Sequence, residues 1–478
     1  MSYMRFTHLT STSVHSSWKI FWLFNAIIAG VVLSHYYYEY FLSISWLLFG
    51  CVFLTIGALQ SQRWVIVCIV IGGMAIGLWR GSLVLQELTT YQQLVGRAVI
   101  VRGIVSEDVV RGKRGDTQIV VRDILMDDQK IPGTIWLSTR SKTIIQRSDT
   151  IEIYGIMKNG FGSFNASMSG ATIRKVYKGN DTARDARDWF SGQVRQSIKE
   201  PEASLGIGFL VGQRSSLPEE LDNALRVAGL THIVVASGYN LTILLRLARR
   251  LFEKISKYLT ALFGGLLITG FILVTGLSPS MSRAGLVAGL SLAAWYYGRT
   301  FNPFILLSIV AGISVLVNPM YIWGDVGWYL SFAAFAGVMI IAPLLHHYFF
   351  GPKKPTFFRQ ILFETVSALI MTIPIILIIF QQYSTYALLA NILVVPIIPI
   401  VMFLVFIAGI IPLTGFFAEL SLRYITHVVS WINVLPQASG DASISNWAVI
   451  AWYSVIIICA WYMWHITKHD FRQDNLVE

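Results

Sequence analysis

A short polar stretch interrupts apolar sequence at residues 231–242, which read THIVVASGYNLT. On a helix, Ser237 and Asn240 share a face because they are three residues apart, and His232 falls on a nearby face. Polar side chains are costly in lipid and normally face an interior, while Gly238 favours a break or a close backbone approach. Broken helices at membrane depth occur only where they line a cavity or are buried in protein. The stretch therefore indicates a broken helix beside a hydrated path, with helix–helix packing through Ser and Gly as the alternative.

Three further polar groups occur within apolar sequence. Arg283 begins an apolar run, and Asp325 stands at a predicted outer end, so these two side chains have the charges to form a pair. Ser331 lies in the same run as Asp325, and Asn391 precedes two prolines that are expected to kink a span and free its carbonyl groups. The candidate residues for a hydrated path are therefore His232, Ser237, Gly238, Asn240, Arg283, Asp325, Ser331 and Asn391.

Two other functions are compatible with parts of this pattern. An intramembrane serine hydrolase would use Ser237 as its nucleophile, but His232 lies off the face of Ser237, so His427 would have to act as the base. A small-solute multi-pass transporter would be favoured by inverted internal repeats, and the sequence shows none. We therefore expect a protein that is not an enzyme and keep these two functions as alternatives.

The cysteines and histidines form no metal-binding pattern. Cys51, Cys68 and Cys459 all lie in apolar stretches, where a free cysteine is usually a core residue. The sequence has no Cys-x-x-Cys pair, and its nine histidines are scattered. We expect no metal and no cofactor.

The composition shows which elements must position these residues. Of 478 residues, 55% are hydrophobic and only 13% are charged, about half of the roughly 25% typical of soluble domains. The mean hydropathy is +0.60. These values exclude an ordinary cytosolic enzyme, a disordered chain and a disulfide scaffold. They leave a polytopic α-helical membrane protein with at least one water-exposed part.

About twelve transmembrane helices are predicted from the apolar runs. Lys and Arg residues are concentrated in every second loop between these runs. By the positive-inside rule those loops are cytoplasmic, which places both termini in the cytoplasm and residues 97–199 outside the cytoplasmic membrane. The predicted spans are 20–35, 41–59, 64–78, 232–249, 259–277, 281–297, 303–317, 326–345, 362–380, 388–411, 416–434 and 448–466.

The region between Arg97 and Lys199 differs from the rest of the chain in composition and in hydrophobic pattern. It contains 18 Lys and Arg against 11 Asp and Glu, and its apolar residues alternate. Alternation predicts β-strands, and five short strands fit a small barrel of the OB type, with a five-stranded sandwich nearly as plausible. The predicted strands are 98–110, 117–126, 131–138, 151–157 and 171–177.

Together these patterns divide the chain into five parts. A three-helix membrane segment is followed by an extracytoplasmic OB-like β domain, interfacial amphipathic helices, a transmembrane domain and a cytoplasmic tail. Their predicted bounds are 1–91, 92–180, 181–230, 231–467 and 468–478.

An outward basic domain favours an anionic partner, such as nucleic acid, anionic lipid or a cell-wall polymer. The alternative is a domain that is simply soluble and slightly basic, in which Trp136 is a core residue of its strand. The sharpest basic loop begins at Arg111. The candidate nucleic-acid-binding residues are Arg111, Lys113, Arg114, Trp136, Arg140 and Lys142.

The order of the motifs resembles the ComEC-type competence family, the inner-membrane channels for incoming DNA. Two positions depart from the family pattern: Tyr239-Asn240 stands where a Leu-His pair is usual, and Trp328 replaces a usual Phe. If that histidine is needed for chemistry, Asn240 puts activity in doubt, whereas a pore or packing group can be an Asn. The segments that carry the resemblance are 206–214, 225–238, 275–284, 325–332 and 389–396.

The resemblance implies a channel that moves single-stranded DNA across the cytoplasmic membrane during natural transformation. It also implies a DNA-receptor protein outside the membrane and an ATPase or helicase inside, since the sequence has no nucleotide-binding motif. Many family members continue into a metallo-hydrolase-like domain, which this sequence lacks. Transport without strand degradation, or degradation by a separate nuclease, is therefore expected.

Overall fold

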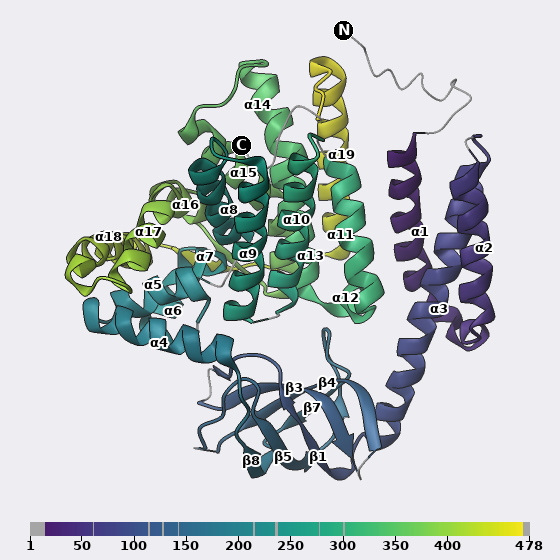
Figure 1. The fold of residues 1–478 in the computed structure, drawn as a ribbon, viewed down its shortest axis with the longest axis horizontal. Helices are drawn as coiled ribbons and strands as arrows, with labels where there is room; N and C mark the ends of the chain where they lie inside the picture. Colours follow the sequence, from purple (N-terminus) through teal and green to yellow (C-terminus); the bar gives the residue numbers. More distant parts are fainter. Residues whose placement is uncertain are drawn as a thin grey trace.

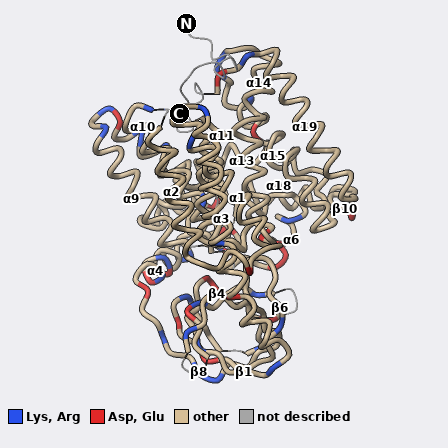
Figure 2. Tube along the Cα trace, turned by 90° about the vertical axis from the view of Figure 1, so that its right-hand side faces the viewer, with Lys and Arg blue, Asp and Glu red and all other residues tan. Residues whose placement is uncertain are grey.

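The computed structural model describes residues 15–60, 62–112, 115–126, 129–141, 143–213, 216–234, 238–276, 278–299 and 302–471. A β domain lies at one end of a large group of helices, and three helices stand at the side of that group (Figure 1). Helix α1 begins and α19 ends at the end of the molecule opposite the β domain. Charged residues gather at these two ends and leave the middle mostly uncharged (Figure 2).

The three helices at the side are α1 (Ser16–Tyr37), α2 (Ser45–Leu59) and α3 (Val65–Leu94). Helix α3 is long and leads directly into the β domain. Small residues let α1 and α3 approach closely, because a Cβ added at Gly77 would lie 2.2 Å from the carbonyl oxygen of Ile27. This is the close packing that small residues allow between membrane helices, which have no hydrophobic driving force to associate.

Eight strands form the β domain, and all five predicted strands are present, although the first ends at Val105. The additional strands are the short β2, β6 and β7. The strand order is β6-β7-β4-β3-β1-β5-β8, with β2 on β3. The strands are β1 (Ala98–Val105), β2 (Val110–Arg111), β3 (Thr117–Met126), β4 (Gln129–Thr139), β5 (Thr150–Ile156), β6 (Lys158–Asn159), β7 (Ala166–Ser169) and β8 (Thr172–Tyr177).

The sheet closes through the segment that contains β7 and β8. Strand β7 pairs in parallel with β4, and β8 pairs antiparallel with β5. Only residues 170 and 171 separate β7 from β8, so one segment joins the two edges of the sheet. Alternate residues on the inner side, such as Val121, Ile135 and Ile151, are fully buried, and they form the core of this domain.

Three helices follow the β domain: α4 (Thr182–Ser197), α5 (Glu202–Val211) and α6 (Glu219–Val227). They lie between the β domain and the remaining helices (Figure 1). Helix α4 begins at Asp181, whose side chain accepts a hydrogen bond from the backbone N–H of Arg184. Such an N-cap satisfies an otherwise unpaired donor at the start of a helix.

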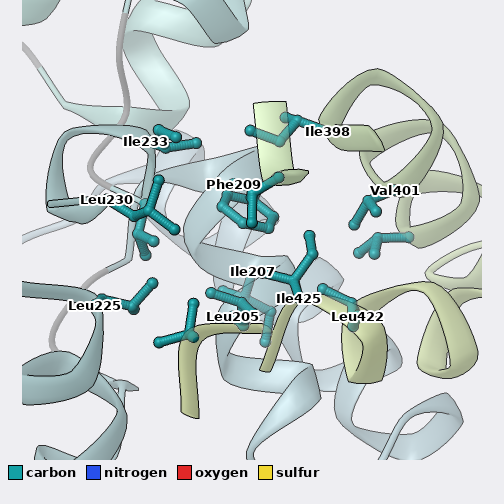
Figure 3. Close-up of a cluster of buried hydrophobic side chains, with 14 of the residues drawn as sticks. Leu205, Ile207, Phe209, Leu225, Leu230, Ile233, Ile398, Val401, Leu422 and Ile425 are labelled. Atoms are coloured by element: carbon teal, nitrogen blue, oxygen red, sulfur yellow. The ribbon is translucent and has the colours of Figure 1, made fainter. Parts of the chain in front are cut away.

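Helix α5 is buried on every side, whereas α4 and α6 bury only one face. Its Leu205, Ile207 and Phe209 lie at the centre of an apolar cluster that also contains residues of α6, α17 and α18, among them Leu225, Val401 and Leu422 (Figure 3). Burial of this much apolar surface is the largest favourable contribution to packing in this part of the molecule.

The rest of the chain is almost entirely helical. A π-helical turn, Gly337–Ile341, lies between α13 and α14, and two short strands, β9 (Gln382–Ser384) and β10 (Ser439–Asp441), pair with each other. The helices are α7 (Thr231–Val234), α8 (Gly238–Phe252), α9 (Lys257–Thr275), α10 (Pro279–Tyr296), α11 (Pro303–Val317), α12 (Met320–Gly324), α13 (Val326–Ala336), α14 (Ala342–Phe350), α15 (Phe357–Ile379), α16 (Ala387–Val394), α17 (Ile398–Ala408), α18 (Gly415–Val434) and α19 (Asn446–Thr467).

Within the described residues, seven helical segments are long and apolar enough to cross a membrane. This number fits a polytopic membrane protein. Helices α2 and α11 are apolar but shorter, and α8, α10 and α18 fall outside the seven, so the count of twelve spans stays a prediction. The seven segments are Ser16–Phe41, Val65–Leu94, Lys257–Thr275, Val326–Phe350, Phe357–Ile379, Ala387–Ala408 and Asn446–Thr467.

Candidate functional site

The helix predicted at 232–249 is described in two parts, α7 (Thr231–Val234) and α8 (Gly238–Phe252). Residues 235–237, and Ser237 with them, lie outside the described residues, so the break expected at Gly238 stays a prediction. Gly238 is exposed, and a Cβ added there would contact the Cβ of Ala284 in α10, at 3.3 Å. Helix α8 therefore lies close to α10 at Gly238.

The side chains of His232 in α7 and Asn240 in α8 differ in their exposure to solvent. The side chain of His232 is exposed, and its Nδ1 lies 3.1 Å from the carbonyl oxygen of Gly229. Asn240 is fully buried and donates from Nδ2 to the carbonyl oxygen of Phe209, at 3.0 Å. Asn240 thus ties α8 to the buried helix α5, which is a packing role, while His232 remains accessible.

Arg283 is a buried cation with spare hydrogen-bonding capacity. Its side chain is in the first turns of α10, 5% exposed, and Nη2 donates to the carbonyl oxygen of Gly327, at 3.0 Å. Its Nε and Nη1 are buried without a hydrogen-bond partner among the described residues. Buried donors without partners are rare and costly, so this guanidinium can accept a ligand that has several acceptor oxygens.

The expected pair between Arg283 and Asp325 is not formed in the part of the chain that the structure describes. Asp325 instead caps α13, since its Oδ1 accepts a hydrogen bond from the backbone N–H of Trp328, at 2.8 Å. Arg283 reaches the carbonyl of Gly327, which lies two residues further along. The sequence prediction was wrong here because a carboxylate at a helix start binds the nearest free backbone donors.

Ser331 and Asn391 lie elsewhere. Ser331 is half-buried within α13, and Asn391 is 3% exposed on α16, where its Nδ2 donates to the carbonyl oxygen of Ala387. His427, the base that the alternative hydrolase would need, is exposed on α18. Gly238 therefore lies next to Ala284, the neighbour of Arg283 in α10. Asn240 and Asn391, in contrast, are buried among packed helices.

A junction between the β domain and the helices was missed by the sequence analysis. Arg147 is 6% exposed and pairs with Asp181 at 2.8 Å. The same guanidinium donates to the carbonyl oxygens of Leu273 and Val274 at the end of α9, at 3.2 and 3.4 Å. Arg147 therefore joins the β domain, α4 and α9, and only the capping position of Asp181 is visible as a local sequence signal.

The electrostatics of this junction follow from its hydrogen bonds. Burial by itself would raise the pKa of Asp181, but the hydrogen bonds from Arg147, the backbone N–H of Arg184 and Ser148 outweigh it and hold the pKa far below its usual range. Nearby, burial raises the pKa of Glu107, and the negative charges of Asp108 and Asp325 raise it further. The loop after β1 thus lies close to the start of α13.

Only three of the six candidate nucleic-acid-binding residues of the β domain lie within the described residues, so their role stays a prediction. Arg111 and Arg140 are exposed at the ends of β2 and β4, while Lys113, Arg114 and Lys142 lie outside the described residues. Trp136 is partly buried and packs against Phe161, with 5.3 Å between the ring centroids. Gly162, next to Phe161, lies against Gly324 of α12, so Trp136 is on the side of the domain that adjoins the helices.

No group of three or more His, Cys, Asp or Glu side chains that could hold a metal ion occurs within the described ranges. Two features remain: a buried arginine, two of whose nitrogens have no hydrogen-bond partner among the described residues, and a β domain tied to the helix ends. They define a class: a polytopic membrane protein with polar groups inside its helical part and a folded domain outside it.

The family follows from comparison with known proteins. The family model described as "Competence protein" matches residues 209–466, and the chain belongs to this family. The matched residues contain α7, α8 and Arg283, whereas the β domain precedes them. No solved structure matches the chain.

A curated relative with detectable similarity is "ComE operon protein 3" of Bacillus subtilis (strain 168). It is 24% identical over 252 residues, which cover 51% of this chain and 31% of the relative. The chain therefore corresponds to less than a third of the length of the curated relative that it matches.

Proposed function

We propose that this protein is a membrane channel that translocates single-stranded DNA across the cytoplasmic membrane during natural transformation. Membership of the competence family supports this proposal. The observation that carries it is the buried guanidinium of Arg283, at the side of the helical part where the β domain is attached. Two of its nitrogens have no hydrogen-bond partner within the part of the chain that the structure describes.

The physical argument is that a polyanion cannot cross hydrocarbon without a hydrated route lined by satisfied polar groups. In the proposal, the helix breaks before Gly238, which has no side chain and lies next to Ala284 of α10. Helices α10 and α13 begin at the same side, and helix N-termini carry partial positive charge. In the proposal, Arg283 contacts phosphates, and His232, Ser237 and Ser331 line the path, with Asp325 capping α13 at its edge.

We propose that the β domain is an OB-like barrel that stands outside the cytoplasmic membrane and binds DNA. The strand order and the parallel β4–β7 pairing support this assignment, because together they join the edges of the sheet as a five-stranded barrel requires. The five-part division of the chain, twelve spans and cytoplasmic termini belong to the same proposal. A DNA-receptor protein would act outside and an ATPase or helicase inside, with a separate nuclease as a further partner.

Deletion of the gene in a naturally transformable host tests the proposal. Transformation frequency should fall to background and return when the wild-type chain is supplied. An Arg283→Gln variant should restore it only in part, about 10- to 100-fold below the wild type as expected for one lost charge-assisted contact, whereas Arg299→Gln, which changes an exposed arginine just beyond the far end of α10, should restore it fully. Unchanged transformation in a strain shown to lack the protein would overturn the proposal.

A further inference from the structure

We infer that the face of the barrel formed by β1, β5 and β8 is a binding track for single-stranded nucleic acid. This surface, called the distal face, was not indicated by the sequence analysis, which favoured the loop at Arg111. The inference rests on the proposed function and names the surface that would first meet the DNA. The distal face consists of Ile100, Arg102, Glu152, Tyr154, Arg174, Lys175 and Tyr177.

The register of the strands puts these side chains together. Ile100 lies opposite Tyr154, and Arg102 opposite Glu152, in the pairing of β1 with β5. Glu152 lies opposite Lys175 in the pairing of β5 with β8. Successive side chains on a strand point to opposite faces, and the intervening Val101, Ile151 and Ile153 fill the core. On β8, the register shift at Glu152/Ile153 makes Arg174 an extra residue, so that the consecutive Arg174 and Lys175 are both exposed. The residues of the distal face therefore point to solvent.

Two arginine side chains of this face stack on exposed tyrosine rings. The Cζ of Arg102 lies 4.9 Å from the ring centroid of Tyr177, and the Cζ of Arg174 lies 4.9 Å from that of Tyr154. Both tyrosines remain exposed, at 43% and 41%. A stacked guanidinium keeps its edge donors free for phosphate oxygens, and exposed rings beside arginine are what sequence-tolerant single-strand binders use to stack bases.

The charge of the face is complementary to a phosphate chain. Arg102, Arg174 and Lys175 outnumber the single carboxylate of Glu152. A hollow of about 440 Å³ beside Arg102 is lined also by Asp123 and Lys130, and these two form an ion pair at 2.7 Å. The carboxylate of Asp123 is therefore compensated, and the surface next to the hollow stays basic.

The position of the distal face leaves it open. Strands β3, β4 and β7 lie on the side of the barrel nearest the helices, and β1, β5 and β8 lie farthest from them (Figure 1). OB folds commonly bind oligonucleotides on the face of their second and third strands, which here are β3 and β4. The loop that packs on Trp136 of β4 also contacts α12 through Gly162. That side of the barrel is thus engaged by the helices, whereas the distal face is free.

The test uses the full-length protein in nanodiscs of neutral lipid and a short fluorescent oligothymidine. Neutralising Arg102→Gln with Arg174→Gln should raise Kd about tenfold or more and lower the slope of log Kd against log salt by about 1.4, the value for two lost single-strand phosphate contacts. Tyr154→Ser with Tyr177→Ser should raise Kd about tenfold or more without changing the slope, because stacking is not ionic.

The matched control is Lys158→Gln with Lys199→Gln, which removes the same charge from exposed sites off this face. It should leave Kd within about twofold of the wild type, and all variants should keep the wild-type melting temperature because the changed side chains are exposed. Loss of binding in the control but not in the distal-face variants would overturn the inference and leave the proposed function standing.

Two further measurements probe the class of ligand. Duplex DNA of the same length should bind more weakly than the oligothymidine, because its bases are already stacked; equal binding would overturn the single-strand assignment. Polyphosphate should compete poorly against the oligothymidine. Equal competition, combined with no effect of the tyrosine changes, would show a general polyanion site instead. Failure of the gene deletion to alter transformation is a separate outcome, since it concerns the proposed function and not this surface.

Discussion

At the scale of single residues, Arg283 is the side chain whose state is hardest to explain by folding alone. A buried cation costs free energy unless it is paired and hydrogen-bonded. This one donates a hydrogen bond to the carbonyl oxygen of Gly327, while its Nε and Nη1 have no partner among the residues that the structure describes. Such a cost is expected where a charge serves a ligand.

Replacing Arg283 with Met should therefore separate function from stability. Transformation should fall about 10- to 100-fold, as expected for one lost charge-assisted contact of about 1.5–3 kcal/mol, while the melting temperature in detergent should stay the same or rise. Arg283→Lys should give an intermediate frequency because it keeps the charge but not the forked donors. A parallel fall of melting temperature and activity would identify Arg283 as a structural residue.

A second prediction at this scale concerns acid. The pKa values of Asp181 and Asp149 are lowered in the folded protein, since their hydrogen bonds outweigh the effect of burial. Their contribution to stability is therefore complete above the unfolded value of about 3.9 and is lost as the pH falls below it. These two carboxylates should not change the melting temperature between pH 7 and pH 5. At pH values below about 4, the melting temperature should decrease.

The matched variant for the acid prediction is Asp181→Asn, which keeps a capping side chain but leaves Arg147 without its charge partner. It should lower the free energy of unfolding at pH 7 by about 3–5 kcal/mol, the usual cost of breaking a buried pair. The melting temperature of this variant should also fall less steeply below pH 4 than that of the wild type. If the melting temperature of the variant falls below pH 4 as steeply as that of the wild type, Asp181 does not cause the acid sensitivity.

At the scale of elements, the packing of α1 on α3 depends on glycine. A Cβ at Gly77 would lie 2.2 Å from a backbone oxygen of α1, and one at Gly30 would lie 2.3 Å from a backbone oxygen of α3. Neither contact can be relieved by a side-chain rotation, because the obstructing atoms belong to the backbone. The two helices must therefore separate if either glycine is enlarged.

Gly77→Ala should lower the free energy of unfolding by about 1–3 kcal/mol, the usual cost of overpacking. Gly289→Ala in α10 is the control, because an added Cβ there meets no atom within 4 Å of the described structure and alanine is the better helix former. Thermal unfolding in detergent measures both. Equal effects of the two changes would contradict close α1–α3 packing.

At the scale of the whole molecule, the β domain lies opposite the end at which α1 begins and α19 ends (Figure 1). The charged residues gather at these same two ends (Figure 2), which is the arrangement expected when a membrane surrounds the uncharged middle. The molecule therefore has two water-exposed ends that should differ in their access from outside the cell.

Cysteine labelling tests this arrangement in a variant that lacks Cys51, Cys68 and Cys459. Thr172→Cys, exposed on β8, should react with a membrane-impermeant maleimide in intact cells whose outer layers are permeable to it. Lys254→Cys, exposed between α8 and α9, should react only after the cytoplasmic membrane is opened. The reverse pattern would invert the proposed orientation, and labelling of both in intact cells would contradict the spanning of a membrane.

Local patterns in the sequence determined much of this protein. The lengths of the apolar runs predicted most of the helices, and alternation predicted β1, β3, β4, β5 and β8, because the period of a segment decides which of its side chains can be buried. The break predicted at Gly238 rests on a local property too, the low helix preference of glycine, and it stays a prediction because residues 235–237 lie outside the described residues. The order of motifs pointed to the competence family for the same reason: motifs are local.

Contacts between distant segments were decided only by the tertiary structure. The parallel pairing of β4 with β7, the burial of α5 on every side and the turn of Arg283 toward Gly327 instead of Asp325 all join residues far apart in the chain. The same holds for the distal face, where strands bring Arg102 next to Tyr177. Such contacts depend on how packed surfaces fit together, and no local period encodes which surface a segment will meet.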